Sequence, residues 1–335
     1  MGQYILRRLI LIIPTLIGLS LLTFTISKVV PADPAKLAAG PRATPDMVET
    51  IREEYGLNDP LYVQYGRYVT NLATGDWGRS IVSRREVVED LKHYFPATLE
   101  LVLASELLAI LIGVPMGIVA ALHQNRWPDQ LSRLIAVSFV SLPRFWFAII
   151  LQLLVVVGLG LLPLSGRLPP TVVPPDRVTG LYTIDSLLQM DLATFWTALR
   201  HLVLPAFVQS VGAMAIITRT VRGDMLEALS RDFVRTARAK GLSERKVIIR
   251  HALRNALIPT TTMIGLSFGF ALGGSVLVET VFDWPGIGLY AVQSVINFDF
   301  EPIMGVTLLV GILFILLNLA VDLFYGVLDP RIRFK

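Results

Sequence analysis

Apolar segments long enough to cross a lipid bilayer are the strongest constraint on this fold. The first of them, from Leu9 to Val30, has about 22 residues, and roughly 20 are needed for a helix to span the hydrocarbon core. Backbone groups in hydrocarbon must pair within their own segment, so each such run is expected to be helical. Further runs lie at 97–121, 134–161, 201–219, 257–282 and 302–327, and the run 134–161 is interrupted by Pro143 and Arg144. The sequence therefore predicts an all-α membrane protein with six transmembrane helices.

The composition fits a chain that lipid solvates over much of its length. Hydrophobic residues make up 53% of it, charged residues only 17%, and the mean hydropathy is +0.62; a soluble domain has roughly 25% charged residues. The chain has no cysteine, which excludes disulfides, thiolate metal sites and cysteine nucleophiles. A net charge of +4 is no signal for nucleic acid, because basic residues in a membrane protein mostly mark its cytosolic loops.

The distribution of Lys and Arg predicts the orientation. Basic residues precede the first run at Arg7 and Arg8, and follow the last run in the tail 329–335, whereas 283–301 has acidic residues and no Lys or Arg. Both termini are therefore expected on the cytosolic side of the membrane. The first run has the charge pattern of a signal peptide as well, but it is long for one and lacks a clean cleavage site, so we favour a retained helix.

The polar segments between the runs divide the chain. Residues 1–30 form the N-terminal tail and first transmembrane helix, and 31–96 form an extracytoplasmic subdomain of two or three short helices, with Gly and Asp clusters at its turns. Five transmembrane helices make up a core over 97–328, which contains a cytoplasmic loop at 220–256. A cytoplasmic tail, 329–335, follows. The extracytoplasmic subdomain is thus an insertion between the first and second spans.

The loop at 220–256 is the most basic in the chain, with ten Lys or Arg between 219 and 254 against four acidic residues. Apolar residues recur at every fourth position, which predicts one stripe of an amphipathic helix: Val221, Met225, Leu229, Phe233 and Ala237. Gly241 is suited to end this helix in a left-handed conformation, and Ser243 to cap a second one with Glu244 in its first turn. The pattern predicts a helix, a tight turn and a helix that ends before Pro259.

The segment "RTARAKGL…ALRNALIP" resembles the cytoplasmic "EAA" loop of ABC-importer permeases, in the variant found in the dipeptide, oligopeptide and nickel branch. Arg235, Thr236 and Ala237 stand where that loop has Glu-Ala-Ala, Gly241 stands at its Gly, and Pro259 lies somewhat beyond its Pro. The fragments "ILRRL", "PLSGR" and "WPGIG" also resemble that branch, in the same order. The resemblance covers nearly the whole chain.

The resemblance implies the type I ABC importer permease fold, a place in the cytoplasmic membrane of a bacterial or archaeal cell, and the role of the loop. In that family the loop docks into a groove on an ATPase subunit and follows its motion; the matching residues here are Arg235, Thr236, Ala237, Lys240, Gly241, Leu242 and Pro259. The implied partners are a second permease subunit, two ATPase subunits that hold ATP and Mg²⁺, and an extracytoplasmic substrate-binding protein. The implied substrate is a di- or oligopeptide, with nickel, glutathione or an oligosaccharide as the alternatives.

Four polar residues inside the apolar runs are candidates for lining a pore: Glu106, Arg144, Gln209 and Ser210. A carboxylate in hydrocarbon costs a few kcal/mol even on a lenient insertion scale, so Glu106 must face other helices or water. The long stem of Arg144 allows its charge to reach a polar region. Glu106 would either contact a charged end of the substrate or hydrogen-bond between helices as a packing residue.

Motifs for catalysis are missing. No G-x-x-x-x-G-K-[ST] segment is present, so ATP hydrolysis is expected in partner subunits. The histidines at 93, 123, 201 and 251 lack metal-ligand spacing, and no serine lies in a G-x-S-x-G elbow. We therefore expect neither catalytic, metal-binding nor cofactor-binding residues in this chain.

Two other function classes use features that this sequence has. A secondary transporter or channel would need no ATPase, but the missing inverted repeat argues against it. A membrane-tethered DNA-binding regulator could use the basic helix-turn-helix-like loop. Both ends of that loop are tied to transmembrane runs within a few residues, which leaves little reach into a DNA groove, so no nucleic-acid partner is expected.

Overall fold

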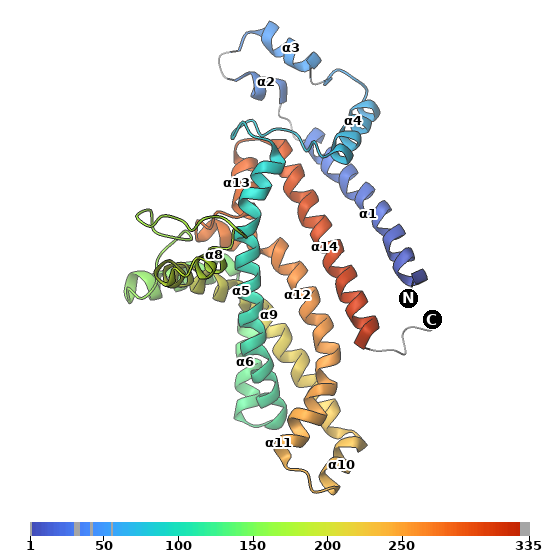
Figure 1. Ribbon diagram of the computed structural model, residues 1–335, viewed down its shortest axis with the longest axis vertical. Helices are drawn as coiled ribbons and strands as arrows, with labels where there is room; N and C mark the ends of the chain where they lie inside the picture. The colour runs from blue at the N-terminus through green and yellow to red at the C-terminus, as the bar shows by residue number, and fades with distance from the viewer. Residues whose placement is uncertain (1, 30–33, 41–42, 55, 329–335) are drawn as a thin grey trace. The chain divides into compact units, whose positions relative to one another are not determined.

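The computed structural model describes residues 2–29, 34–40, 43–54 and 56–328 (Figure 1). The cytoplasmic tail expected at 329–335 falls outside these ranges. The side chains of residues 2–9, 28, 29, 34, 37, 38 and 322–328, among them those of Arg7 and Arg8, are not described either.

The described residues are mostly helical and form no strand, apart from one isolated bridge between Arg79 and Glu86. In the described part of the chain, five helices are long and apolar enough to cross a membrane, and a bent pair makes a sixth candidate. The all-α membrane fold is thereby confirmed. The elements are α1 (Gly2–Val29), α2 (Pro34–Ala39), α3 (Pro45–Glu54), α4 (Leu61–Thr74), α5 (Val87–Leu122), α6 (Trp127–Ser141), α7 (Arg144–Leu151), the π-helix η1 (Gln152–Gly158), α8 (Tyr182–Leu188), α9 (Leu192–Ser230), α10 (Asp232–Ala239), α11 (Glu244–Lys246), the π-helix η2 (Val247–Leu253), α12 (Arg254–Val281), α13 (Ile287–Ile296) and α14 (Phe300–Leu328).

The chain divides into two compact units, which are described separately. The first comprises residues 1–96 and 285–315. In it, α4 packs on α1 through two hydroxyl contacts, Ser20 with Tyr65 at 3.0 Å and Thr23 with Tyr68 at 3.3 Å. Its apolar core joins the start of α5 to α13 and α14 through Val87, Leu91, Ile287, Tyr290 and Val306.

The second span begins earlier than the sequence suggested. We expected it to start at Ala97, but α5 begins at Val87 and runs unbroken through Pro96. Glu89 and Asp90 lie in its first turn, where the helix dipole favours acidic side chains, and Val87 and Leu91 are buried. The last ten residues of the predicted subdomain 31–96 are therefore the first turns of this helix.

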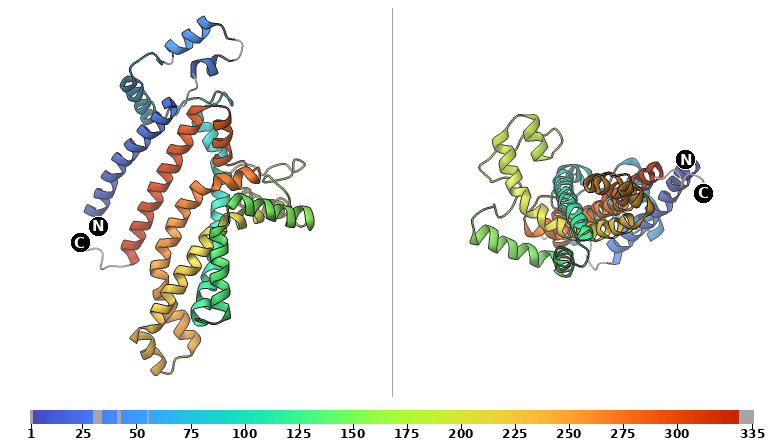
Figure 2. Two further views of the ribbon diagram at one scale, coloured as in Figure 1. Left: turned by 180° about the vertical axis from the view of Figure 1, so that it is seen from behind. Right: turned by 90° about the horizontal axis from the view of Figure 1, so that it is seen from below.

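The second unit comprises residues 97–284 and 316–335, and its centre is the pair α9 and α12, with α6 beside α9 (Figure 2). α9 has 39 residues, twice the length predicted for the fourth span. The backbone of α5 approaches α9 closely, since a Cβ added at Gly117 would lie 2.8 Å from the carbonyl oxygen of Thr218. Glycine at this position lets the two helices pack.

The third span, predicted over 134–161 with an interruption at Pro143 and Arg144, is broken at that place. α6 ends at Ser141, and the segment of α7 and η1 leaves it at an angle of 106°. The break falls at Leu142 and Pro143, where the backbone is extended. Proline lacks the N–H that would continue the helix, and it disfavours helical geometry in the preceding residue. The polypeptide therefore turns at Pro143 and does not cross in one line.

Candidate functional site

The loop between α9 and α12 consists of two short helical segments and a tight turn. α9 ends at Ser230, the extended residue Arg231 (ψ 151°) breaks the helix, and α10 follows. Gly241 has φ +75°, the left-handed conformation predicted for it, which glycine adopts without steric cost. Ser243 precedes α11 as predicted, but its side chain makes no capping hydrogen bond.

The single extended residue changes which side chains face inward. The predicted stripe holds at Val221 and Met225, which are fully buried, but Phe233 is 39% exposed and Val234 is buried in its place. An extended residue at 231 shifts the helical register, so a four-residue period cannot continue through it. The prediction that Phe233 continues the stripe is therefore wrong.

The inner sides of the two segments share one apolar core with the end of α9. Val234 and Ala237 from α10, Val247 and Ala252 from η2 and Met225 from α9 are all buried in it. Buried side chains of this kind are close-packed, so a displacement of one moves its neighbours. The loop is thus fixed to the ends of α9 and α12, and a force on it is transmitted to both helices.

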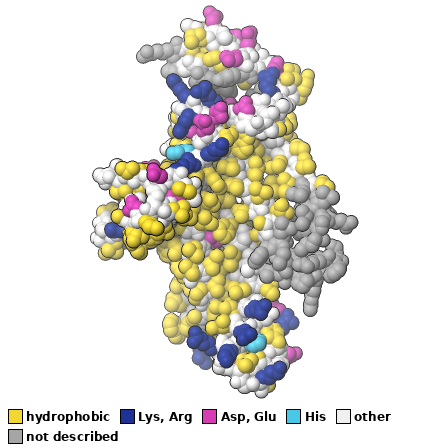
Figure 3. All heavy atoms as spheres, in the orientation of Figure 1, with side chains coloured by type: hydrophobic (Ala, Val, Ile, Leu, Met, Phe, Trp, Pro, Cys, Tyr) yellow, Lys and Arg dark blue, Asp and Glu magenta, His cyan; other side chains and the backbone are white. Residues whose placement is uncertain are grey.

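The outer side of the loop is polar and basic. Arg235 is 77% exposed, and Thr236, Lys240 and Leu242 are exposed as well. Arg238 of α10 pairs with Glu244 of α11 across the turn, with Nη2 donating to Oε1 at 2.5 Å. Lys and Arg gather at this end of the surface view, where α10 and α11 lie in Figure 1 (Figure 3).

Two of the residues predicted for the loop site lie elsewhere than on this outer side. Ala237 is buried in the apolar core and presents no side chain to a partner. We expected the helix to end before Pro259, and this prediction is wrong. Pro259 lies inside α12, which continues to Val281. Proline is tolerated within membrane helices because neighbouring groups can satisfy the freed carbonyl.

Near the base of the loop lies a buried ion pair that the sequence does not predict. Asp129 of α6 is fully buried and accepts two hydrogen bonds from Arg222 of α9, at 2.6 and 2.8 Å. The backbone N–H of Asn125 donates to it as well, at 2.8 Å. A sequence shows both charges, but it does not pair residues 93 positions apart.

Three of the four candidate pore residues lie along one face of α12. Glu106 of α5, 1% exposed, accepts a hydrogen bond from Ser267 at 2.8 Å. Gln209 of α9 donates to the carbonyl of Ala271 at 2.9 Å, and the guanidinium of Arg144 lies against Gly274. Positions 267, 271 and 274 share a helix face. Ser210, the fourth, is buried and bonds within its own helix to Phe207.

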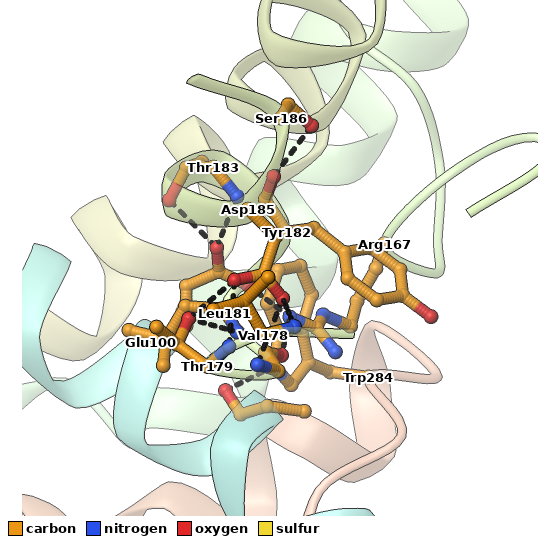
Figure 4. A network of polar contacts seen from close by, with 12 residues as sticks. Glu100, Arg167, Val178, Thr179, Leu181, Tyr182, Thr183, Asp185, Ser186 and Trp284 are labelled. Atoms are coloured by element: carbon orange, nitrogen blue, oxygen red, sulfur yellow. Dashed lines mark hydrogen bonds and ion pairs between the residues drawn. The ribbon is translucent and has the colours of Figure 1, made fainter. Parts of the chain in front are cut away.

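At the other end of α9, a polar network holds the segment before α8 (Figure 4). Glu100 of α5 accepts hydrogen bonds from Arg167 at 2.5 Å and from the backbone and hydroxyl of Thr183 at 2.8 and 2.7 Å. The Arg167 guanidinium also stacks on the Tyr182 ring, 3.5 Å from its centroid. Glu100 stands near the outer end of a predicted span, but its partners could not be found from spacing.

Asp185 organises the same segment. Burial alone would raise its pKa, but hydrogen bonds from Thr179, Gly180 and Val178 outweigh it and hold the pKa of this carboxyl below its usual value. Three of these bonds are donated by backbone N–H groups and one by the Thr179 hydroxyl, over 2.7 to 3.3 Å. Glu100 and Asp185 together fix the path of residues 167–185.

The sequence matches two family models that together extend over most of the chain. Residues 113–334 match the model described as "Binding-protein-dependent transport system inner membrane component". Residues 1–102 match the model described as "Binding-prot-dependent transport system membrane comp, N-term".

Individual relatives match over nearly their full lengths. The probable D,D-dipeptide transport system permease protein DdpB of Escherichia coli is 47% identical over 94% of this chain and 93% of that protein. The dipeptide transport system permease protein DppB of Alkalihalophilus pseudofirmus is 43% identical, and the glutathione transport system permease protein GsiC of Escherichia coli 41% identical, each over the whole of both chains. The chain belongs to the family of binding-protein-dependent transport system inner-membrane components, the permease subunits of ABC importers.

Proposed function

We propose that this permease imports short peptides, driven by ATP hydrolysis in partner subunits. The observation that carries the substrate class is the full-length similarity to permeases named for dipeptides and for glutathione, itself a tripeptide. Arg144 is half-buried and Glu106 is buried, and both side chains lie against α12. Two charged groups at this place support a path for molecules with charged ends. Gln209 and Ser210 complete the four residues proposed for this path.

The loop 220–256 is proposed as the contact with an ATPase subunit. Its exposed residues Arg235, Thr236, Lys240, Gly241 and Leu242 would form the contact, and its buried side would pass the motion to α9 and α12. ATP and Mg²⁺ would be held by two such ATPase subunits, and no cofactor by this chain. A second permease subunit and an extracytoplasmic binding protein would complete the complex.

The proposal places the loop and both termini on the cytosolic side. The excess of Lys and Arg at 219–254 supports this orientation, because basic loops remain in the cytosol. The segment 167–185 and the helices α2 to α4 would then lie on the outer side, where the binding protein delivers its ligand.

The test is reconstitution of the complete complex in proteoliposomes with its binding protein and a labelled dipeptide. Uptake is expected only when ATP is present on the side of the membrane that the loop faces. An ion gradient alone should drive no uptake. Uptake driven by a proton or sodium gradient without ATP would replace the proposal with a secondary transporter.

Glutathione is the second substrate candidate, supported by the full-length match to GsiC. Competition decides between them. If unlabelled glutathione displaces the labelled dipeptide from the binding protein and from uptake at lower concentration than other peptides do, glutathione is the substrate. If glutathione competes weakly or not at all, dipeptides remain the proposed substrate.

A further inference from the structure

We propose that Arg144 binds the carboxylate of the substrate inside the permease, and that two glycines leave the room that its guanidinium occupies. This inference rests on the proposed function, because it assumes that a molecule with a carboxylate passes along α9 and α12. It goes beyond the family assignment by naming the recognition group and the group that it recognises.

The first observation is where the charge lies. Arg144 is the first residue of α7, directly after the break at Pro143, and it is half-buried. An arginine within a transmembrane segment costs a few kcal/mol or more unless it meets water or a partner, and such residues mark functional sites by default. The turn of 106° between α6 and α7 directs this side chain toward α9 and α12, where it contacts both.

The second observation is that no protein carboxylate satisfies it. Among the residues that the structure describes, Arg144 has neither a hydrogen-bond partner nor an acidic group within 4.0 Å. Glu106 interacts with it electrostatically, but the Glu106 carboxylate is 1% exposed and accepts from Ser267. The planar guanidinium, with donors in a fork that fits a carboxylate, is thus left to bind another molecule.

The third observation is the space made for the guanidinium. A Cβ added at Gly274 of α12 would lie 2.5 Å from Nη1 of Arg144, and one added at Gly212 of α9 would lie 3.0 Å from Nη2. Any side chain at 274 would therefore displace the guanidinium. The preceding residue, Gly273, has no atom within 4 Å of the position that its Cβ would take, so Gly273 provides a matched control.

These three observations assign Arg144 to a substrate carboxylate. A bidentate, charge-assisted pair of this kind is worth about 1.5–3 kcal/mol, which corresponds to a change of roughly 10- to 100-fold. A dipeptide and glutathione both carry such a group, so the assignment holds for either substrate candidate.

The experiment uses the complete complex in proteoliposomes and one dipeptide in two forms, with a free and with an amidated C-terminus, each at a concentration that saturates the binding protein. Arg144→Gln is expected to lower ATP-driven uptake of the free peptide at least tenfold while leaving uptake of the amide unchanged, and Arg144→Lys to recover part of it. The exposed Arg126→Gln controls for loss of a positive charge. Equal loss of both peptides in Arg144→Gln, or no loss, would overturn the assignment.

A second comparison does not depend on the amide. Gly274→Ala is expected to reproduce the loss of Arg144→Gln for the free peptide, and Gly273→Ala to transport as the unmodified complex does. Assembly of the complex is quantified for every variant. Equal behaviour of the two alanine variants would contradict the proposal, whereas absence of peptide uptake by the unmodified complex would reject the proposed function and not the role of Arg144 alone.

Discussion

Gly241 is the residue on which the geometry of the loop depends. Its φ of +75° is rare for residues with a Cβ and is most unfavourable for β-branched ones, yet no neighbouring atom lies within 4 Å of its Cβ position. Substitution therefore acts through backbone strain and not through a clash.

We predict that Gly241→Val abolishes transport and lowers peptide-stimulated ATPase activity, with the protein still inserted in the membrane. Gly241→Asn should retain most activity, because asparagine tolerates the left-handed conformation. Gly223→Ala, in α9 with open space around it, is the control. Normal uptake by Gly241→Val would show that the turn has no role in coupling.

Asp129 is the second residue with a decisive role, since it joins α6 to α9 below the loop. Removal of one partner of a buried ion pair costs up to about 3–5 kcal/mol; Arg222 retains a side-chain exposure of 21%, so the lower end applies. Asp129→Ala should lower the thermal midpoint of the purified complex and uncouple ATPase activity from uptake.

Arg133→Gln is the matched control for that variant. Arg133 contacts the same carboxylate at 3.4 Å but is 52% exposed, and exposed pairs contribute about 0–1 kcal/mol. A thermal midpoint equal in Asp129→Ala and Arg133→Gln would mean that the pair with Arg222 contributes nothing.

At the scale of elements, the segment 167–185 should depend on pH through Asp185. The pKa of this carboxyl in the unfolded chain is about 3.8, and hydrogen bonds lower its pKa in the folded state. A group with a depressed pKa stabilises the folded state fully above the unfolded pKa, and this contribution is lost as the pH falls through the folded pKa. Hydrogen-exchange protection of residues 178–180 should therefore be constant from pH 7 to about 5 and fall below about pH 4.

Asp185→Asn tests the cause of this acid sensitivity. The amide cannot titrate, so its protection should be lower than that of the unmodified chain at pH 7 and should not fall further in the acid range. An unchanged acid transition in Asp185→Asn would assign the transition to another group.

The elements also show how far the sequence can be interpreted. The apolar runs, the left-handed Gly241 and the exposed Arg235 and Lys240 follow from local chemistry, and the sequence predicts them. The interruption at Pro143 follows as well, but its angle of 106° does not. The break at Arg231 and the passage of α12 through Pro259 do not follow either, because packing against other helices decides whether a local breaker acts. The pairs Asp129 with Arg222 and Glu100 with Arg167 join distant segments, which a single sequence cannot align.

At the scale of the whole molecule, the chain is half of a proposed pore whose motor lies in other subunits. Its second unit contains the contact surface proposed for that motor. It also contains the face of α12 against which Glu106, Gln209 and Arg144 lie. α9 and α12 are packed against each other and against the loop. A movement of the loop therefore has a direct mechanical route to Arg144, Glu106 and Gln209.

The most direct test of this account measures on which side of the membrane the loop lies, and whether the ATPase subunits cover it. The chain contains no cysteine, so Lys240→Cys introduces its only thiol. A membrane-impermeant maleimide should label it in inverted vesicles that lack the ATPase subunits, should label it much less when those subunits are bound, and should not label it in intact cells. Labelling from outside intact cells, or labelling unchanged by the ATPase subunits, would contradict the account.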